Sequence, residues 1–171
     1  PIRIYYIGRL DKDSEGLLLL TNQGELVNKM MRSGNQHEKE YVVTVNKPVT
    51  KEFIKKMQEG VPILGTKTRK CRVIQTGEKS FRIILTQGLN RQIRRMCQYL
   101  GYEVKRLKRI RVMNIELGDL PVGAYREVTA QEMKTLQEMI KDSSETTVIK
   151  KERGKKCESD RKNEGTRRTV K

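Results

Sequence analysis

The sequence is poor in the residues that build metal centres and disulfide frameworks. Its 171 residues include one histidine, three cysteines and no tryptophan. Cys71, Cys97 and Cys157 are odd in number and widely spaced, so we expect reduced thiols rather than disulfides or a C-x-x-C zinc pair. The single histidine, His37, has no second histidine at metal-ligand spacing. We therefore expect no metal site.

Long apolar runs and nucleotide-binding glycine loops are missing as well. No stretch reaches the roughly 18 apolar residues that a transmembrane helix needs, and residues 1–10 lack the pattern of a secretory leader. Neither G-x-x-x-x-G-K-[ST] nor G-x-G-x-x-G occurs, which argues against the nucleotide-binding loops that these patterns mark. The sequence therefore predicts a cytoplasmic protein that has no membrane partner.

Basic residues are present in large excess. The chain has 37 Lys and Arg against 21 Asp and Glu, which gives a formal net charge of +16. A field of this sign attracts polyanions, so nucleic acid is the expected partner. Over residues 142–171 bulky apolar residues almost vanish, and such a segment cannot bury enough apolar surface to offset its ordering entropy. We expect a folded domain over residues 1–141, followed by a disordered basic tail.

Apolar periodicity and turn signals predict an α+β fold, a sheet with helices packed on it. Thr129 followed by Glu132 forms a capping-box pattern before the last expected helix, and Asn22 followed by Glu25 marks the start of an earlier one. Residues 71–88 split around a central T-G-E-K turn into two runs rich in β-branched residues, as a hairpin does. We expect a strand at 40–48, a hairpin at 71–88, and helices at 24–33, 50–60 and 130–141.

An acidic turn precedes an apolar stretch near the N-terminus. In "GRLDKDSEGLLLLTNQGEL", residues 8–26, Asp11 and Asp13 come just before the run Leu17–Leu20. Turns favour Asp, Ser and Gly for backbone reasons, so a solvated turn would explain these residues without any chemistry. A carboxylate held in place for catalysis is the other interpretation.

A second stretch places basic residues at the start of an expected helix. In "QGLNRQIRRMCQYLGY", residues 87–102, Asn90 is a candidate N-cap, and an apolar stripe runs from Ile93 to Leu100 at helical spacing. Three arginines fall in the first turns: Arg91, Arg94 and Arg95. A solvated basic face would explain them, but cations at a helix N-terminus work against the macrodipole. We therefore expect an anionic partner for them, and Asp11 is a candidate.

Taken together, these stretches resemble the RsuA-type family of ribosomal RNA pseudouridine synthases. The resemblance covers about residues 5–140 and is carried, in the family's order, by "GRLDKDSEGLLLLTN", "KEYVVTV", "QGLNRQIRRM" and "VKRLKRIRVMNI". It implies an isomerase that breaks the bond between uracil N1 and the ribose, turns the base and joins C5 to the sugar, with no cofactor or metal. It also implies the family's fold, a mixed and mainly antiparallel sheet with helices packed on it and a central active-site cleft.

The resemblance implies three catalytic residues. The family's catalytic Asp maps onto Asp11, acting as nucleophile or as base, its aromatic partner onto Tyr41, and its basic partner onto Arg94. An arginine suits the third role because its guanidinium stays charged and offers a fork of donors to a carboxylate. A tyrosine suits stacking on a uracil that has been flipped out of the RNA. We expect the Arg94 guanidinium about 2.7–3.2 Å from the Asp11 carboxylate, with Tyr41 lining the same cleft.

Other polar and basic residues are expected to hold the RNA. The candidates are Arg9, Lys39, Asn90, Arg91, Arg95, Lys105 and Lys108, with Arg106, Arg109 and Arg111 completing the last cluster. We expect Arg9, Lys39, Arg91 and Arg95 around the mouth of the cleft, where Arg9 would either fill the gap left by the flipped base or contact a phosphate. The last cluster alternates in part with Val104, Leu107 and Ile110, so its members cannot all face RNA. The expected substrate is 23S rRNA, with tRNA as a further candidate, and the expected state is a monomer.

The sequence departs from the family pattern in two places. Members of the family usually begin with a small S4-like RNA-binding domain and an "LNKPxG"-like strand, and neither precedes Gly8 here. We therefore expect the catalytic domain to be shortened at its N-terminus relative to the family. Arg91 also stands where some relatives carry His.

A non-catalytic RNA-binding or ribosome-assembly module is the competing interpretation. It would account for the positive charge and for the basic tail. It would not account for Asp11, Tyr41 and Arg94 together, because a carboxylate in an RNA groove repels phosphate.

Overall fold

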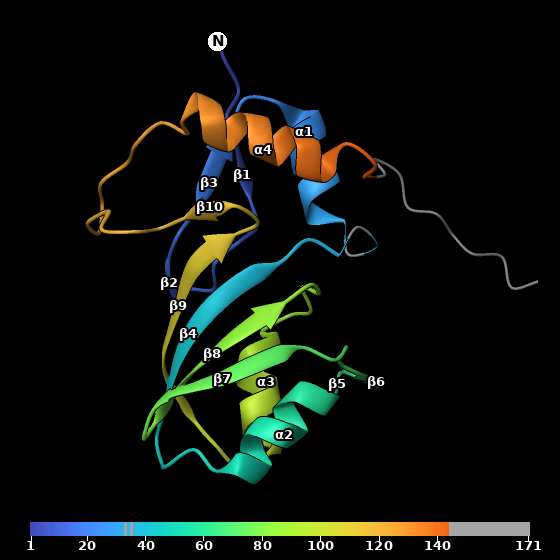
Figure 1. Ribbon diagram of the computed structural model, residues 1–171, viewed down its shortest axis with the longest axis vertical. Helices are drawn as coiled ribbons and strands as arrows, with labels where there is room; N and C mark the ends of the chain where they lie inside the picture. The colour runs from blue at the N-terminus through green and yellow to red at the C-terminus, as the bar shows by residue number, and fades with distance from the viewer. Residues whose placement is uncertain (33, 35, 144–171) are drawn as a thin grey trace, which may run out of the picture.

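The computed structural model describes residues 1–32, 34 and 36–143 as an elongated α+β structure built on one central sheet (Figure 1). The strands of this sheet are β2 (Glu15–Gly16), β4 (Lys39–Val45), β7 (Arg72–Gly77), β8 (Ser80–Leu85), β9 (Val104–Val112) and β10 (Ile115–Glu116). Their order is β10-β9-β4-β8-β7, with β2 paired to β9 off this path. All pairs are antiparallel except β2 with β9, which is parallel. The expected mixed, mainly antiparallel sheet is confirmed.

Side chains that alternate along the central strands build one apolar face of the sheet. In β8, Phe81, Ile83 and Leu85 are buried, while the residues between them are only partly covered. In β4, Val43 and Val45 are buried on the same face. This period of two is typical of a strand with one face in the core, and each such side chain contributes about 1.5–3 kcal/mol through its burial.

Two helices cover this apolar face at one end of the molecule, α2 (Lys51–Glu59) and α3 (Gln92–Tyr99) (Figure 1). In α2, Phe53 and Met57 lie one turn apart and are buried. The side chain of Thr50 caps this helix by accepting a hydrogen bond from the backbone N–H of Phe53 at 3.0 Å. A short hairpin of β5 (Pro62–Ile63) and β6 (Thr66–Lys67) follows α2.

A second core lies at the other end of the molecule. It is formed by β1 (Tyr5–Ile7), β3 (Leu19–Thr21), α1 (Gly24–Met31) and α4 (Ala130–Ile140), together with the end of β9 (Figure 1). The strand β9 belongs to both cores, because Leu107 packs in the first and Val112 in the second. The two cores are thus joined through β9, and the segment between β1 and β3 lies against this strand.

Several local predictions are confirmed and two are wrong. Thr129 and Glu132 form the expected capping box at the start of α4, and the hairpin of β7 and β8 turns where the sequence predicted. Helix α1 has Gln23 at its N-cap position rather than Asn22. In α3 the N-cap position belongs to Arg91, with a φ of 49°, and not to Asn90. The tail expected over 142–171 lies outside the described residues from position 144 onward.

Candidate active site

A cleft opens on the core face of the central sheet, beside the start of α3. It is lined by residues 8–11 and 14 of the segment 8–14, which we call the Asp11 loop, and by side chains from β4, β9 and the segment 85–93. Asp11 is the one acidic residue among the described residues of this lining. The lysines and arginines that line the cleft are Arg9, Arg32, Lys39, Arg91 and Arg109. A cleft with this balance of charge attracts an anionic ligand.

Backbone contacts hold the Asp11 loop in shape. Gly8, at its first position, has a φ of 76°, a conformation that glycine adopts without steric cost. The backbone N–H of Ser14 donates to the carbonyl oxygen of Asp11 at 2.9 Å, which closes a turn around the carboxylate. Asp11 is half-buried, and within the described part of the chain no hydrogen bond or ion pair engages its carboxylate. The loop thus presents an acidic side chain that is free to meet a ligand.

Tyr41 and Lys39 project from β4 into the same cleft. They are two residues apart on one strand, so they lie on the same face of the sheet. Tyr41 is half-buried, packs against the first core and pairs in register with Arg109 of β9. Burial and the nearby Arg109 charge lower the pKa of Lys39. The structure therefore brings Asp11, Lys39 and Tyr41 together, although 28 residues separate Asp11 from Lys39 in the chain.

The expected pairing of Arg94 with Asp11 is wrong in its details. The Nη2 group of Arg94 donates to the backbone carbonyl oxygen of Asp13 at 2.5 Å, and its Nη1 group lies 3.5 Å from the carbonyl oxygen of Val104. Arg94 therefore contacts the backbone of the Asp11 loop instead of its carboxylate. Arg91 is the arginine of this helix start that pairs with an acidic side chain of the loop, with its Nη1 at 3.8 Å from the Asp13 carboxylate. Arg94 does not line the cleft.

The candidate RNA-binding residues divide into two groups. Arg9, Lys39, Asn90 and Arg91 line the cleft. Arg95, Lys105 and Lys108 do not. The guanidinium of Arg95 turns back to the carbonyl and side-chain oxygens of Asn90, at 3.0 and 3.1 Å. This contact also explains why the Asn90 side chain does not cap α3.

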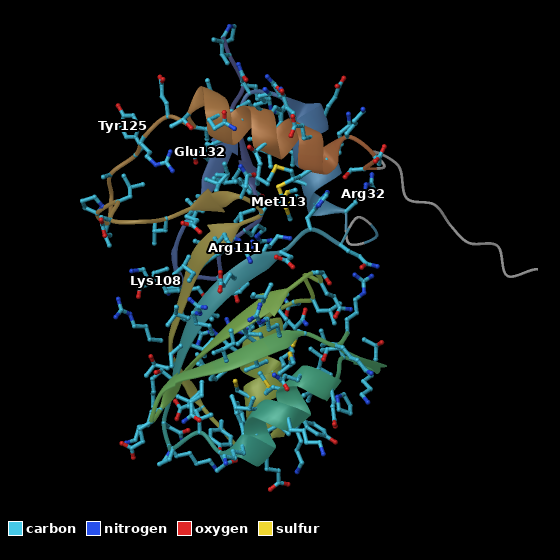
Figure 2. The ribbon with its side chains drawn as sticks, viewed as in Figure 1. Arg32, Lys108, Arg111, Met113, Tyr125 and Glu132 are labelled. Carbon is cyan, nitrogen blue, oxygen red and sulfur yellow. The ribbon has the colours of Figure 1, made fainter. Side chains whose placement is uncertain are left out.

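The expected basic cluster on β9 is split between the two faces of the sheet. Lys108 pairs with Val42, so it lies on the face opposite Tyr41, and Figure 2 shows Lys108 and Arg111 along this strand. Arg111 is bound by carboxylates, with Nε at 2.9 Å from Glu40 and Nη2 at 3.1 Å from Glu38. It is therefore not a free cation for phosphate, which agrees with the expectation that the members of this cluster cannot all face RNA.

Arg109 differs most from the sequence-based expectation. It is only 1% exposed and lines the floor of the cleft, whereas the sequence suggested a surface residue. A register shift between Glu40 and Tyr41 leaves Ile110 unpaired, so Arg109 and Arg111 point to opposite faces despite their spacing of two. Sequence alternation alone could not have revealed this bulge. The apolar residues of this strand fall at positions 104, 107, 110 and 112 instead of every second position, and this irregular spacing was the available hint.

The described residues hold no arrangement typical of a metal centre or a membrane span. Within residues 1–32, 34 and 36–143, no three His, Cys, Asp or Glu side chains gather as ligands of one ion would. In the same residues, no helix combines the length and the apolar character needed to cross a bilayer. His37, at the edge of the cleft, is bonded instead to the hydroxyl of Ser143, with Nε2 and Oγ 2.8 Å apart. The cleft itself offers one carboxylate, one tyrosine and several cations.

Comparison with known proteins finds that this chain is similar to enzymes named for pseudouridine formation in RNA. Residues 1–99 match the family described as RNA pseudouridylate synthase. The chain is 58% identical over 142 residues to the dual-specificity RNA pseudouridine synthase RluF of Escherichia coli (strain K12), a match that covers 83% of this chain and 49% of RluF. It is 39% identical over 143 residues to the ribosomal large subunit pseudouridine synthase B of Bacillus subtilis (strain 168), covering 80% of this chain and 59% of that protein.

A solved structure shares the fold. The crystal structure of a pseudouridylate synthase superposes with a TM-score of 0.75 at 29% sequence identity, covering 78% of this chain and 59% of that one. The matched proteins are longer than this chain. The chain spans about half the length of the RluF relatives that it matches.

Proposed function

The chain belongs to the RNA pseudouridylate synthase family, and from this membership we propose that it isomerises uridine to pseudouridine in RNA, with Asp11 as the catalytic carboxylate. The reaction breaks the N1–C1′ glycosidic bond, turns the uracil and forms a C5–C1′ bond, after which C5 loses its proton and N1 takes one up. The observation that carries the proposal is the position of Asp11, which is the one acidic residue among the described residues lining a cleft rich in cations.

The charges around Asp11 suit a carboxylate that must stay ionised next to RNA. Arg9, Lys39 and Arg91 line the cleft with it, and phosphates bound by these side chains would bring the ribose of a target nucleotide close to the carboxylate. Asp11 can then act on the sugar or the base either as a nucleophile or as a base.

Tyr41 is proposed to hold the flipped uracil. A base inside a stem or a stacked loop cannot reach Asp11, so it must leave the stack at a cost of a few kcal/mol. Stacking on an aromatic ring returns about 1–3 kcal/mol per base. Tyr41 lies on the cleft floor beside Lys39, where its ring can contact a base whose sugar lies at Asp11, and where its hydroxyl can take part in proton transfer at C5.

The proposed substrate is 23S rRNA, with tRNA as a second substrate. The matching relatives support this choice, because one is named for large-subunit ribosomal RNA and another for dual specificity. With ribosomal RNA as substrate, the proposed place of action is the cytoplasm. The proposed catalytic unit is a monomer, because the segments that carry Asp11, Lys39 and Tyr41 already meet in one cleft within a single chain.

The decisive test compares Asp11→Asn with Asp13→Asn in the complete protein. Unmodified ribosomal RNA is incubated with each variant, and pseudouridine is mapped as carbodiimide-dependent stops of reverse transcriptase. Asp11→Asn should lower the rate by about 10²–10⁴-fold while leaving RNA affinity unchanged, because the exchange removes the reacting group but not the phosphate contacts. Asp13→Asn should retain activity, since its carboxylate is 62% exposed and lies outside the cleft lining.

Two results would contradict the proposal. A near wild-type rate for Asp11→Asn would show that another group performs the chemistry. A wild-type protein that binds RNA tightly but forms no pseudouridine would favour a non-catalytic RNA-binding or ribosome-assembly role instead.

A further inference from the structure

We propose that Arg109 is a positioning residue that fixes the Asp11 loop, and with it the catalytic carboxylate, against the central sheet. The inference rests on the proposed function of Asp11. It concerns a residue that, within the described part of the chain, forms no hydrogen bond or ion pair with the Asp11 side chain but binds the backbone on both sides of it.

The side chain of Arg109 joins the two ends of the segment that carries Asp11. Its Nη2 group donates to the carbonyl oxygen of Gly8 at 2.9 Å, and its Nε group donates to that of Leu17 at 2.8 Å. The Nη1 group lies 3.5 Å from the carbonyl oxygen of Arg9. In return, the backbone N–H of Leu17 donates to the carbonyl oxygen of Arg109 at 2.8 Å. One residue of β9 thus holds both ends of the turn around Asp11.

The burial of Arg109 shows that its charge serves a specific purpose. The residue is 1% exposed, and within residues 1–32, 34 and 36–143 no carboxylate forms an ion pair with it. A buried cation without a counter-ion is costly unless its donors are hydrogen-bonded, and here backbone carbonyls meet them. The planar fork of an arginine carries donors on three nitrogens and so reaches carbonyls of separate residues, whereas a lysine ammonium donates from a single nitrogen.

The glycines of the motif G-R-L-D-x-x-x-x-G fit this interpretation. A Cβ atom on Gly8 would lie 3.2 Å from Nη1 of Arg109. A Cβ atom on Gly16 would lie 2.1 Å from the carbonyl oxygen of Arg109, closer than any real contact. The two glycines that bracket Asp11 are therefore the positions where the segment presses on Arg109, at its side chain and at its backbone.

Arg109 also connects the Asp11 loop with the other catalytic candidate. The bulge at Ile110 places Arg109 directly opposite Tyr41 in the pairing of β4 with β9. The same residue therefore binds the backbone before and after Asp11 and lies beside the ring proposed to stack on the uracil. A shift of Arg109 would change the separation between carboxylate and base, and a misplacement of about 1 Å can cost about 10²-fold in rate.

The test compares Arg109→Met with Arg126→Met in the complete protein. Methionine keeps the apolar volume of each side chain and removes its donors. Arg126 is a suitable control because it also makes several hydrogen bonds, to Glu132, Glu127 and Glu116, but it does not line the cleft. Pseudouridine formation is measured under single- and multiple-turnover conditions, at a temperature where circular dichroism shows every variant to be folded.

Arg109→Met should lower kcat by about 10²-fold and leave KM near the wild-type value, because the phosphate contacts remain. Arg126→Met should lower the unfolding temperature without changing kcat. Amide hydrogen exchange supplies a readout that does not need activity, since the amides of Ser14 and Leu17 should exchange faster in Arg109→Met while those of β8 do not. If Arg109→Met fails to fold, Arg109→Lys is compared in the same way, and it should show the same lowered kcat and loop exchange in weaker form.

The proposal is overturned if folded Arg109→Met, or Arg109→Lys in its place, keeps the wild-type kcat, or if the loop amides stay as protected as in the wild type. An inactive wild-type protein would instead refute the proposed function. In that case hydrogen exchange alone still decides whether Arg109 orders the Asp11 loop.

Discussion

Replacing Gly16 with alanine should separate the Asp11 loop from β9. The added Cβ atom would lie 2.1 Å from the carbonyl oxygen, 2.7 Å from the nitrogen and 2.9 Å from the carbonyl carbon of Arg109. All three are backbone atoms, so no side chain can swing away to make room. Ordinary van der Waals contact begins near 3.4 Å, which means that β2 must move away from β9 by about 1 Å.

The magnitude follows from two contributions. Gly16 has a φ of 110°, and an L-residue forced into a positive φ costs about 1–2 kcal/mol. The separation also breaks two hydrogen bonds between Leu17 and Arg109, each of about 0.5–1.5 kcal/mol. We therefore expect Gly16→Ala to lower the free energy of unfolding by about 2–5 kcal/mol, and to lower the rate of pseudouridine formation as well.

Gly123→Ala is the matched control, and urea denaturation followed by circular dichroism is the assay. Gly123 has a φ of 79°, but a Cβ atom there would meet no other atom within 4 Å. Its replacement should therefore show the cost of the backbone conformation alone, about 1–2 kcal/mol, with no loss of activity. Equal losses of stability in the two variants would refute the reasoning, because the close approach of Gly16 to Arg109 would then carry no energy.

Two further predictions concern titrating groups. Burial raises the pKa of the Cys97 thiol to about 12 and that of Cys71 to about 11, so iodoacetamide at pH 8 should leave both unmodified until the chain unfolds. Labelling of either thiol in the folded protein, detected by peptide mass spectrometry, would contradict this. A hydrogen bond from Arg126 lowers the pKa of Glu132 from 4.5 to about 2. The ionised Glu132 therefore stabilises the folded protein fully above about pH 4.5, and this contribution is lost as the pH falls through about 2. In Glu132→Gln, the free energy of unfolding should therefore depend less on pH in this range. Glu138 is exposed on the same helix, and a similar effect of Glu138→Gln would count against a specific role of the pair formed by Arg126 and Glu132.

The parts of the fold that were predictable have strong local signals. The capping box of Thr129 and Glu132 and the hairpin of β7 and β8 depend on residues close together in the chain, so their patterns are visible in the sequence. The N-cap of α3 was not predictable in the same way. The side chain of Asn90 is taken by Arg95, and Gln92 accepts the hydrogen bond from the N–H of Leu89, so a suitable capping residue was used for another contact.

The site was predictable to the extent that its residues follow motif spacing. Asp11 and Tyr41 lie in one cleft, as the resemblance implied. The contact of Arg94 was not predictable, because the difference between the Asp11 carboxylate and the Asp13 carbonyl depends on how the loop turns. The burial of Arg109 was equally hidden. It results from a bulge in the pairing of β4 with β9, and the register of two strands distant in the chain leaves no mark on either one alone.

A comparison of Asp11 with Glu40 explains why one carboxylate near the cleft is proposed for chemistry and the other is not. Glu40 is 8% exposed, and its two oxygens face Arg82 and Arg111 at 3.5 and 2.9 Å, so its charge is used to hold three strands together. The backbone around Asp11 is fixed by Arg109, yet within the described residues its side chain has no partner. An acid whose position is fixed through the main chain keeps its carboxylate available for a substrate. The contacts of Arg109 thus provide order at Asp11 without neutralising it, as a catalytic carboxylate requires.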